Sequence, residues 1–241
     1  MKIPRWTYSH EMLRRGILFF LLSFGCTTPT LFAQEATQAI SASVGFIENS
    51  QIFTSPQSPD PVDRQQSTNL GGTLAYGISY RVRLLPQVDV QLHGEYVRTR
   101  SETRDRVGTL IENGYDVGLM EVSGMFLLPF STERFEMYVG GGAGGYYARR
   151  SYSVASVSSE TASSMPAFGI HVLLGAEYLL TSRIGIRADV VFRDPQMSVE
   201  NRFSQSSVQA NGLVYTLETD PFLSHVNLNG NVYALGLSWH F

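Results

Sequence analysis

Apolar side chains alternate with small or polar ones along residues 232–241, up to an aromatic residue at position 241. A period of two is typical of a β-strand, because successive side chains point to opposite faces. One face would carry the large apolar residues that suit contact with lipid: Tyr233, Leu235, Leu237, Trp239 and Phe241. The other face would carry Val232, Ala234, Gly236, Ser238 and His240.

Seven further segments have the same period, with turn residues between them, and no helix-period segment follows residue 33. They are 38–47, 69–83, 88–98, 114–128, 135–148, 166–180 and 184–193. Connections 85–87, 129–134 and 181–183 are short, whereas 48–68, 99–113, 149–165 and 194–229 are long. Short turns at one end and long loops at the other are the layout of bacterial outer-membrane barrels. The pattern predicts an all-β fold, an eight-stranded antiparallel up-and-down transmembrane β-barrel with short periplasmic turns and long extracellular loops. We interpret residues 34–241 as one domain, with Pro-rich 55–61 and Ser-rich 151–164 as surface loops.

Two stretches carry a resemblance to a known family. Gly236, Trp239 and Phe241 match the carboxy-terminal insertion signal of outer-membrane barrels, and Ala234 stands where that signal has a polar residue. The Gly-rich run 138–147 and the segment 175–187 resemble the small outer-membrane proteins with an OmpA- or OmpX-like barrel domain. The resemblance implies a barrel placed in the outer membrane of a Gram-negative bacterium by the barrel insertion machinery. In a narrow barrel, glycines let a strand coil and leave room for inward neighbours.

The amino terminus has the features of a secretory signal peptide, which we place at residues 1–33. Basic residues precede the apolar run 16–25, and Leu31-Phe-Ala33 is a suitable cleavage site. A permanent helical anchor would need about 20 apolar residues. Lipidation at Cys26, the only cysteine, stays open as an alternative. Cleavage after Ala33 would remove Lys2, three arginines and one glutamate, which shifts the formal net charge from −3 to −6. A mildly acidic chain with no basic stripe argues against a nucleic-acid partner.

The alternation also places charged residues of both signs in the predicted lumen. An eight-stranded barrel is only wide enough for its interior side chains to fill it, and buried charges are tolerated when they are paired. We therefore expect a polar plug of ion pairs, with a narrow proton or ion path as the alternative. Turn geometry predicts Arg83 opposite Asp89, and Glu177 opposite Arg187 as the main ion pair. The predicted network comprises Arg81, Arg83, Asp89, Glu95, Glu121, Glu136, Glu177, Arg187 and Asp189, with His93, His171 and Arg193 also facing inward.

Candidate catalytic chemistry is sparse. The Gly-rich run lacks the Lys-Ser/Thr pair and the following helix of a phosphate-binding loop. Ser224-His225-Val-Asn227 comes nearest to the site of lipid A deacylases, which have a serine two residues after the histidine; Asn227 stands there instead. The histidines show no metal-ligand spacing. We therefore expect no catalytic site, cofactor or metal, with a lipid-modifying enzyme as an alternative.

The predicted loops carry the remaining possibilities. Arg98, Arg100, Arg104 and Arg106 alternate with acidic residues and are candidates for contact with lipopolysaccharide phosphates, which suit the guanidinium group. The segment 212–217 inside loop 194–229 predicts a hairpin beyond the membrane, whose exposed edge could recruit a partner strand. We expect a monomer in contact with outer-membrane lipid and lipopolysaccharide, with an envelope structural or adhesion-type role; a small passive pore is the other alternative.

Overall fold

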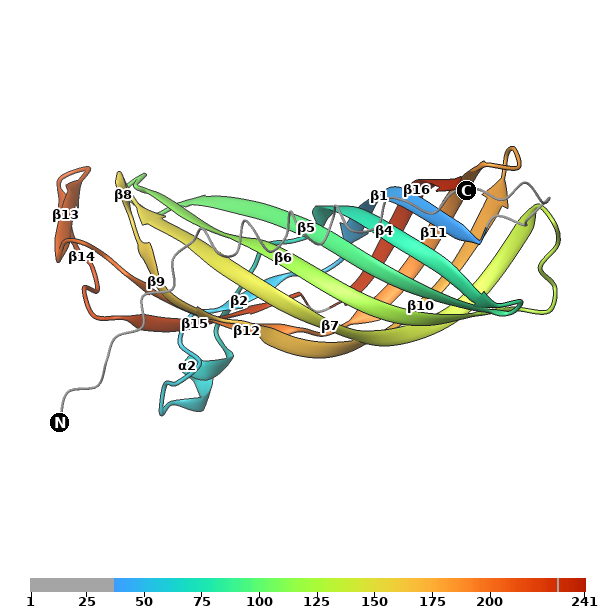
Figure 1. The fold of residues 1–241 in the computed structure, drawn as a ribbon. Helices are drawn as coiled ribbons and strands as arrows, with labels where there is room; N and C mark the ends of the chain where they lie inside the picture. The colour runs from blue at the N-terminus through green and yellow to red at the C-terminus, as the bar shows by residue number, and fades with distance from the viewer. Residues whose placement is uncertain (1–36, 229) are drawn as a thin grey trace, which may run out of the picture. The chain divides into compact units, whose positions relative to one another are not determined.

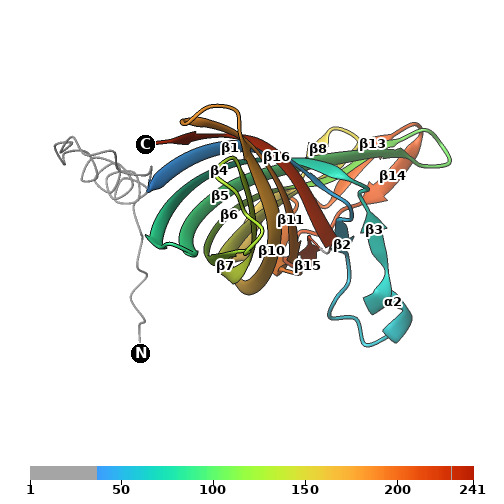
Figure 2. The ribbon, with the colours of Figure 1, turned by 90° about the vertical axis from the view of Figure 1, so that its right-hand side faces the viewer.

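The computed structural model describes residues 37–228 and 230–241. The predicted signal peptide, its cleavage site and Cys26 lie outside these residues. Within the described chain, eight long strands form one closed antiparallel sheet (Figure 1), seen nearly end-on in Figure 2. Neighbours in sequence pair along the sheet, β16 pairs with β1, and the pairing of β7 with β10 completes the ring. The strands are β1 (Gln38–Ile47), β4 (Thr73–Leu85), β5 (Val88–Arg104), β6 (Leu110–Leu127), β7 (Phe135–Val154), β10 (Ala167–Leu179), β11 (Ile184–Arg193) and β16 (Gly230–His240).

All eight predicted strands are present, which confirms the predicted fold class. Three of them, β5, β6 and β7, continue well beyond the predicted boundaries at the long-loop end. The turn after β4 is one residue shorter than predicted, since Leu85 pairs with Val88 and the register shifts between Arg83 and Leu85. This bulge leaves Arg83 opposite Asp89 as predicted.

The long connections contain a second antiparallel sheet at the outer end of the barrel. Its order is β3-β2-β15-β12-β9, with β2 (Gln51–Phe53), β3 (Ser67–Asn69), β9 (Glu160–Met165), β12 (Gln196–Arg202) and β15 (Phe222–Asn227). Two prolines mark the change of sheet: Pro166 separates β9 from β10, and Pro195 separates β11 from β12. Proline has no N–H to donate, so it interrupts strand pairing at both points.

The interpretation of 151–164 as a surface loop was therefore wrong, and loop 194–229 contains more strands than the one hairpin predicted in it. The first segment contains the end of β7, β8 (Val157–Ser158) and β9, and the second contains β12, β15 and a hairpin. That hairpin, β13 (Ser207–Ala210) with β14 (Leu213–Thr216), is at the predicted place. A five-residue helix, α2 (Pro61–Gln65), was also missed. It begins at a proline, and the Asp60 carboxylate accepts a hydrogen bond from the Val62 amide, which is a usual helix start.

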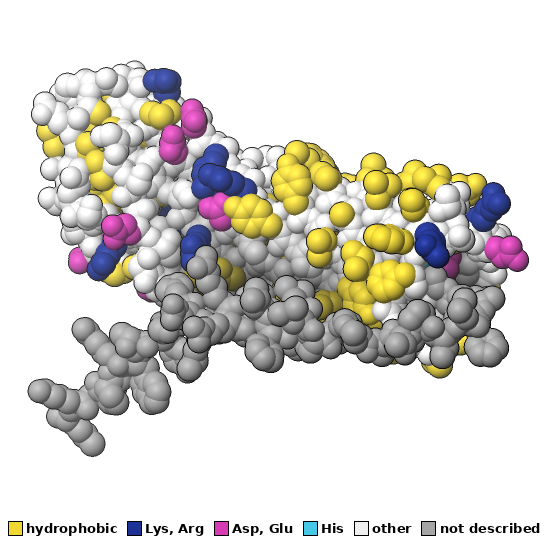
Figure 3. Space-filling model, turned by 45° about the horizontal axis from the view of Figure 1, so that its top comes forward, with side chains coloured by type: hydrophobic (Ala, Val, Ile, Leu, Met, Phe, Trp, Pro, Cys, Tyr) yellow, Lys and Arg dark blue, Asp and Glu magenta, His cyan; other side chains and the backbone are white. Residues whose placement is uncertain are grey.

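An apolar band covers the outward face of the barrel strands. Figure 3 shows hydrophobic side chains gathered over one part of the surface, with most charged side chains beyond it. At the outer limit of the band, Tyr76, Tyr96 and Tyr147 lie in one cross-strand row. At the other limit, Trp239 and Phe241 are exposed. Aromatic girdles at both ends of an apolar band are typical of outer-membrane barrels. No helix in the described residues is long and apolar enough to cross a membrane.

Candidate functional site

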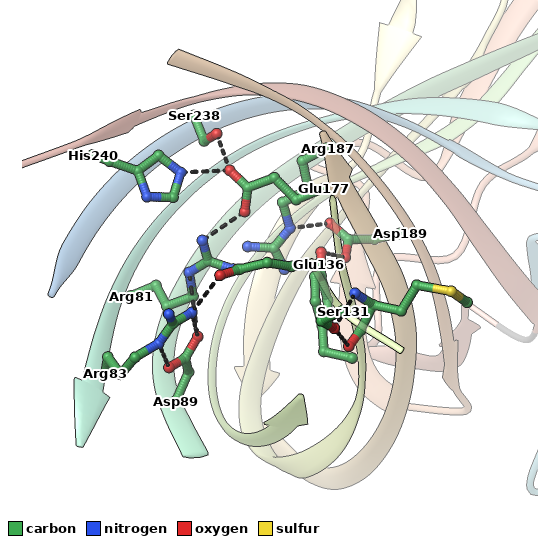
Figure 4. Close-up of polar contacts among 12 residues, drawn as sticks. Arg81, Arg83, Asp89, Ser131, Glu136, Glu177, Arg187, Asp189, Ser238 and His240 are labelled. Carbon is green, nitrogen blue, oxygen red and sulfur yellow. Dashed lines mark hydrogen bonds and ion pairs between the residues drawn. The ribbon is translucent and has the colours of Figure 1, made fainter. Parts of the chain in front are cut away.

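A layer of charged side chains fills the lumen near the short-turn end (Figure 4). In the pairing of β4 with β5, Arg83 lies opposite Asp89 and Arg81 lies opposite Gln91. Arg83 donates to Asp89 at 2.9 Å and to Glu136 on β7 at 2.8 Å. Arg81 donates to Glu177 on β10 at 2.5 Å, and its Nε lies 3.7 Å from Asp89. Four strands are thus joined across the lumen by two guanidinium groups.

The carboxylate of Glu177 is the most enclosed member of this layer, with 1% of its surface exposed. Ser238 on β16 donates a hydrogen bond to its Oε1, and His240 Nε2 lies 2.6 Å from the same oxygen. Arg81 binds the other oxygen, Oε2. A carboxylate held on both oxygens is satisfied even though it is removed from solvent.

The predicted main ion pair between Glu177 and Arg187 does not form. The register is as predicted, with Glu177 opposite Arg187, but the guanidinium turns along its own strand and donates to Asp189 at 2.6 Å. It also lies 5.0 Å from the centre of the Tyr138 ring. Register therefore sets which residues are opposite, while the reach of arginine across the lumen decides which groups bind.

A second charged group lies farther along the lumen. Arg193 on β11 donates to Glu95 on β5 and, at 3.2 Å, to Glu121 on β6. Tyr146 donates to Glu121 at 2.7 Å. His171 Nε2 lies 2.7 Å from Ser123 Oγ, within a buried hydrogen bond. All nine residues of the predicted lumen network thus face inward, although they form two groups rather than one.

An apolar layer follows, and sequence reasoning missed it. On β6 it begins after Glu121 with Leu119, Val117 and Tyr115, and on β7 it comprises Tyr146 and Ala148. Residues of the outer sheet complete it, because β12 and β15 turn apolar side chains inward. The fully buried members are Ile47, Ile52, Val97, Tyr115, Val117, Ala148, Met197, Val199, Val226 and Leu228. The alternation of Met197 with Val199 and of Val226 with Leu228 was the signal that could have revealed it.

The four arginines proposed to contact lipopolysaccharide are divided between two places. Arg98 and Arg100 lie just beyond the apolar band, 3.6 and 3.0 Å from Asp116. Arg104 donates to the Gly108 carbonyl at the tip of the β5–β6 hairpin, where Arg106 is also exposed. Arg98 and Arg104 are six strand residues apart, about 20 Å, so a single phosphate group cannot contact both. Sequence reasoning missed the exposed Arg149, which lies opposite Asp116 in the register.

The segment resembling a deacylase site has a different geometry. Ser224 is fully buried, and its hydroxyl donates to the Val199 carbonyl and accepts from Arg150. The ring of His225, the next residue of β15, interacts instead with Gln196 at 3.1 Å. Adjacent strand residues point to opposite faces, so Ser224 and His225 do not form a nucleophile and base. The described residues contain no group of three or more His, Cys, Asp or Glu placed to hold a metal.

The residues of the predicted insertion signal lie on β16 and at its end. Trp239 and Phe241 are outward and more than half exposed. Gly236 is inward, and a Cβ there would lie 2.6 Å from the Ala42 carbonyl oxygen. The glycine therefore permits the close approach of β1 to β16.

Comparison with known proteins identifies the fold. No protein-family model matches the sequence, and no curated protein matches it. The outer membrane protein OprG from Pseudomonas aeruginosa is 12% identical, with a TM-score of 0.58 over 86% of this chain and 97% of that chain. Ail, the attachment invasion locus protein of Yersinia pestis, is 15% identical, with a TM-score of 0.45 over 86% of this chain and 100% of that chain. The closed barrel, its apolar band and the likeness to OprG together show that the chain has the fold of the small eight-stranded outer-membrane β-barrel proteins of Gram-negative bacteria.

Proposed function

We propose that the protein is a non-enzymatic integral outer-membrane barrel with a closed lumen, serving envelope structure or adhesion-type surface interaction. The observation that carries the proposal is the layered filling of the lumen: two groups of paired charges, then an apolar layer. A polar solute would have to displace the ion pairs and then cross the apolar layer without hydrogen-bond partners, which is costly.

The space left in the lumen supports closure. A cavity of about 30 Å³ lies between the two charged groups, lined by residues such as Gln91, His93 and Ser123. A cavity of this size has room for a few water molecules. The Arg193 side chain, 1% exposed, and the Tyr146 ring border the next stretch of the lumen. A continuous aqueous path would need these side chains to move.

The part beyond the apolar band supports a role at the cell surface. The outer sheet ends in the short edge strand β3, and the β13–β14 hairpin presents exposed Leu213 and Val214. Exposed strand edges can pair with a strand of a partner. The Arg98, Arg100 and Arg149 side chains at the border of the band suit the phosphates of lipopolysaccharide. Export by the predicted signal peptide and insertion through Gly236, Trp239 and Phe241 belong to the same proposal.

Planar-bilayer recordings of the refolded protein test the closed lumen. We expect no single-channel steps from a preparation whose folded state is verified by heat modifiability on a gel. Stable conductance steps would contradict the proposal and favour a passive pore. Incubation with lipid A followed by mass spectrometry tests the absence of enzymatic activity, and loss of an acyl chain would contradict it.

Lipopolysaccharide contact has its own test. Replacing Arg98 and Arg149 by Gln should weaken binding of the purified barrel to lipopolysaccharide, and Arg106→Gln serves as the matched control at the hairpin tip. Equal weakening by both changes would show that the border of the band has no special part in the contact.

A further inference from the structure

An open cup lies at the outer end of the molecule, between the extensions of β5, β6 and β7 and the outer sheet. Tyr215 and Thr216 of the β13–β14 hairpin also line the cup, and the hairpin lies at the left-hand end of Figure 1. The cup has a volume of about 550 Å³, within the usual range of small-molecule sites, roughly 300–1,000 Å³. It lies beyond the apolar layer of the lumen, so it does not depend on whether the lumen conducts.

Aromatic side chains form much of the cup wall. The rings of Tyr152, Phe203 and Phe222 pack against one another, with centroids 5.6, 6.2 and 6.0 Å apart in the three pairs. Val154 and Leu217 join this group and are almost completely buried. A wall of this kind offers favourable contact to an aromatic or apolar ligand body.

A single buried cation, Arg150, lines the cup on β7. It is 4% exposed, and its guanidinium lies 4.7 Å from the Tyr152 ring centre and 5.7 Å from that of Phe222. Nε donates to Asn113 Oδ1 at 3.1 Å, and Nη1 donates to Ser224 Oγ at 2.9 Å. These neutral partners fix the orientation of the guanidinium but do not balance its charge. Glu218 also lines the cup, but it is exposed to solvent and forms no ion pair with Arg150.

Arg150 differs from the lumen arginines in having no carboxylate partner among the described residues. Arg81, Arg83, Arg187 and Arg193 each form an ion pair with an Asp or Glu. Burial without such a partner lowers the pKa of Arg150 to about 10. Burying an unpaired charge is costly, and uncompensated groups of this kind concentrate at functional sites.

We propose that the cup binds a small amphiphilic organic anion, whose carboxylate or sulfonate contacts Arg150 and whose apolar body lies against the aromatic wall. A neutral apolar ligand would leave the buried guanidinium unpaired. A small inorganic anion would leave the apolar wall without a partner. An amphiphilic anion would pair with the guanidinium and also cover the apolar wall.

Two probes of matched shape test the proposal on the full barrel in lipid nanodiscs: naphthalene-2-carboxylate and its neutral carboxamide. Isothermal titration, with empty nanodiscs as the blank, measures both affinities. The wild type should bind the carboxylate about tenfold more tightly than the carboxamide, the difference expected for a charge-assisted hydrogen bond. Arg150→Gln should abolish that difference and leave the carboxamide unaffected. Arg202→Gln, which changes an exposed arginine of β12 outside the cup, should preserve it.

The design does not depend on a single variant. The wild-type comparison needs no substitution, and Arg150→Met, which suits the apolar surroundings, replaces the glutamine variant if that one does not fold. Phe222→Leu should weaken both probes by a similar factor. Absence of saturable carboxylate binding, equal affinities of the wild type for the two probes, or an unchanged carboxylate preference without Arg150 would each overturn the proposal.

Discussion

The Glu177 carboxylate binds the guanidinium of Arg81 across the lumen at 2.5 Å, although 96 positions separate the two residues in sequence. The contact joins β10 to β4, which are not neighbours in the sheet. Both side chains are almost completely buried. This pair therefore ties opposite walls of the barrel together, in a way that backbone pairing alone does not.

Loss of one member of this pair should destabilise the barrel. Glu177→Gln leaves the Arg81 charge without its nearest partner, and breaking a buried pair costs about 3–5 kcal/mol. Combining Glu177→Gln with Arg81→Met removes both charges and should recover much of the loss. Urea unfolding in detergent of the two single variants and the double variant measures the coupling.

The matched control is a second double-mutant cycle, in which Arg187, the residue opposite Glu177 in the register, takes the place of Arg81. Glu177→Gln with Arg187→Met should show little coupling, because Arg187 binds Asp189 instead. A coupling between Glu177 and Arg187 as large as that between Glu177 and Arg81 would contradict the observed pairing.

Strand number and register could be predicted because a period of two and a short turn leave few alternatives. Gly175 opposite Asp189 and Glu177 opposite Arg187 are both as predicted. The ion partner of Glu177 could not be predicted in the same way. It depends on barrel closure and on which of several inward arginines can reach across, and neither is a local property of the sequence.

The outer half was the part that sequence reasoning described poorly. Serine and proline content suggested loops, yet Ser164 donates to the Ala148 carbonyl at 2.5 Å and Asn201 to the Arg150 carbonyl at 3.1 Å. These side chains satisfy the edge of β7 where β9 does not pair with it through the backbone. The polar side chains of these segments form hydrogen bonds between strands. The cup around Arg150 therefore could not be predicted from the alternation of apolar and polar residues.

The glycine run of β7 gives a second prediction. A Cβ at Gly142 would lie 1.8 Å from the Val122 carbonyl oxygen on β6. Gly142→Ala should therefore destabilise the folded barrel by about 1–3 kcal/mol or more, the usual cost of overpacking. Gly124→Ala is the control, since a Cβ there meets nothing within 4 Å. The urea unfolding midpoints of the two variants test this prediction, and the midpoint of Gly142→Ala should be the lower one. Equal midpoints would show that β7 can shift to accommodate the added methyl group.

The contact between the β13–β14 hairpin and the β5–β6 tip should depend on pH. The Tyr215 hydroxyl donates to Asp105, and the Val107 and Thr109 amides donate to the same carboxylate at 3.0 and 2.8 Å. These bonds lower the pKa of Asp105 from its ordinary value of 3.8. The stabilisation is therefore present above that value and is lost as the pH falls through the lower, folded-state pKa.

Tyr215→Phe removes the first of these donors, so it should raise the Asp105 pKa towards 3.8. The variant also lacks the Tyr215–Asp105 hydrogen bond itself, so the pH-dependent part of the hairpin contact should be absent. Titration of the Asp105 carboxyl signal by NMR in both proteins measures the shift. An Asp105 pKa that does not respond to the change would show that the backbone amides alone hold the carboxylate.

The apolar band gives the last prediction, because a Leu→Arg substitution should cost much more stability inside the band than outside it. Leu235 on β16 points outward within the band and is 66% exposed in the protein alone. Leu235→Arg would place a charge in the hydrocarbon region, at a cost of roughly 2–4 kcal/mol near the midplane. Leu213 on β14 is 47% exposed but lies in the outer hairpin. Leu213→Arg should change stability by no more than about 0.5 kcal/mol. Unfolding in lipid vesicles compares the two variants. Equal costs would mean that the face carrying Leu235 does not contact lipid, and a one-residue slip of β16 would then be needed to explain it.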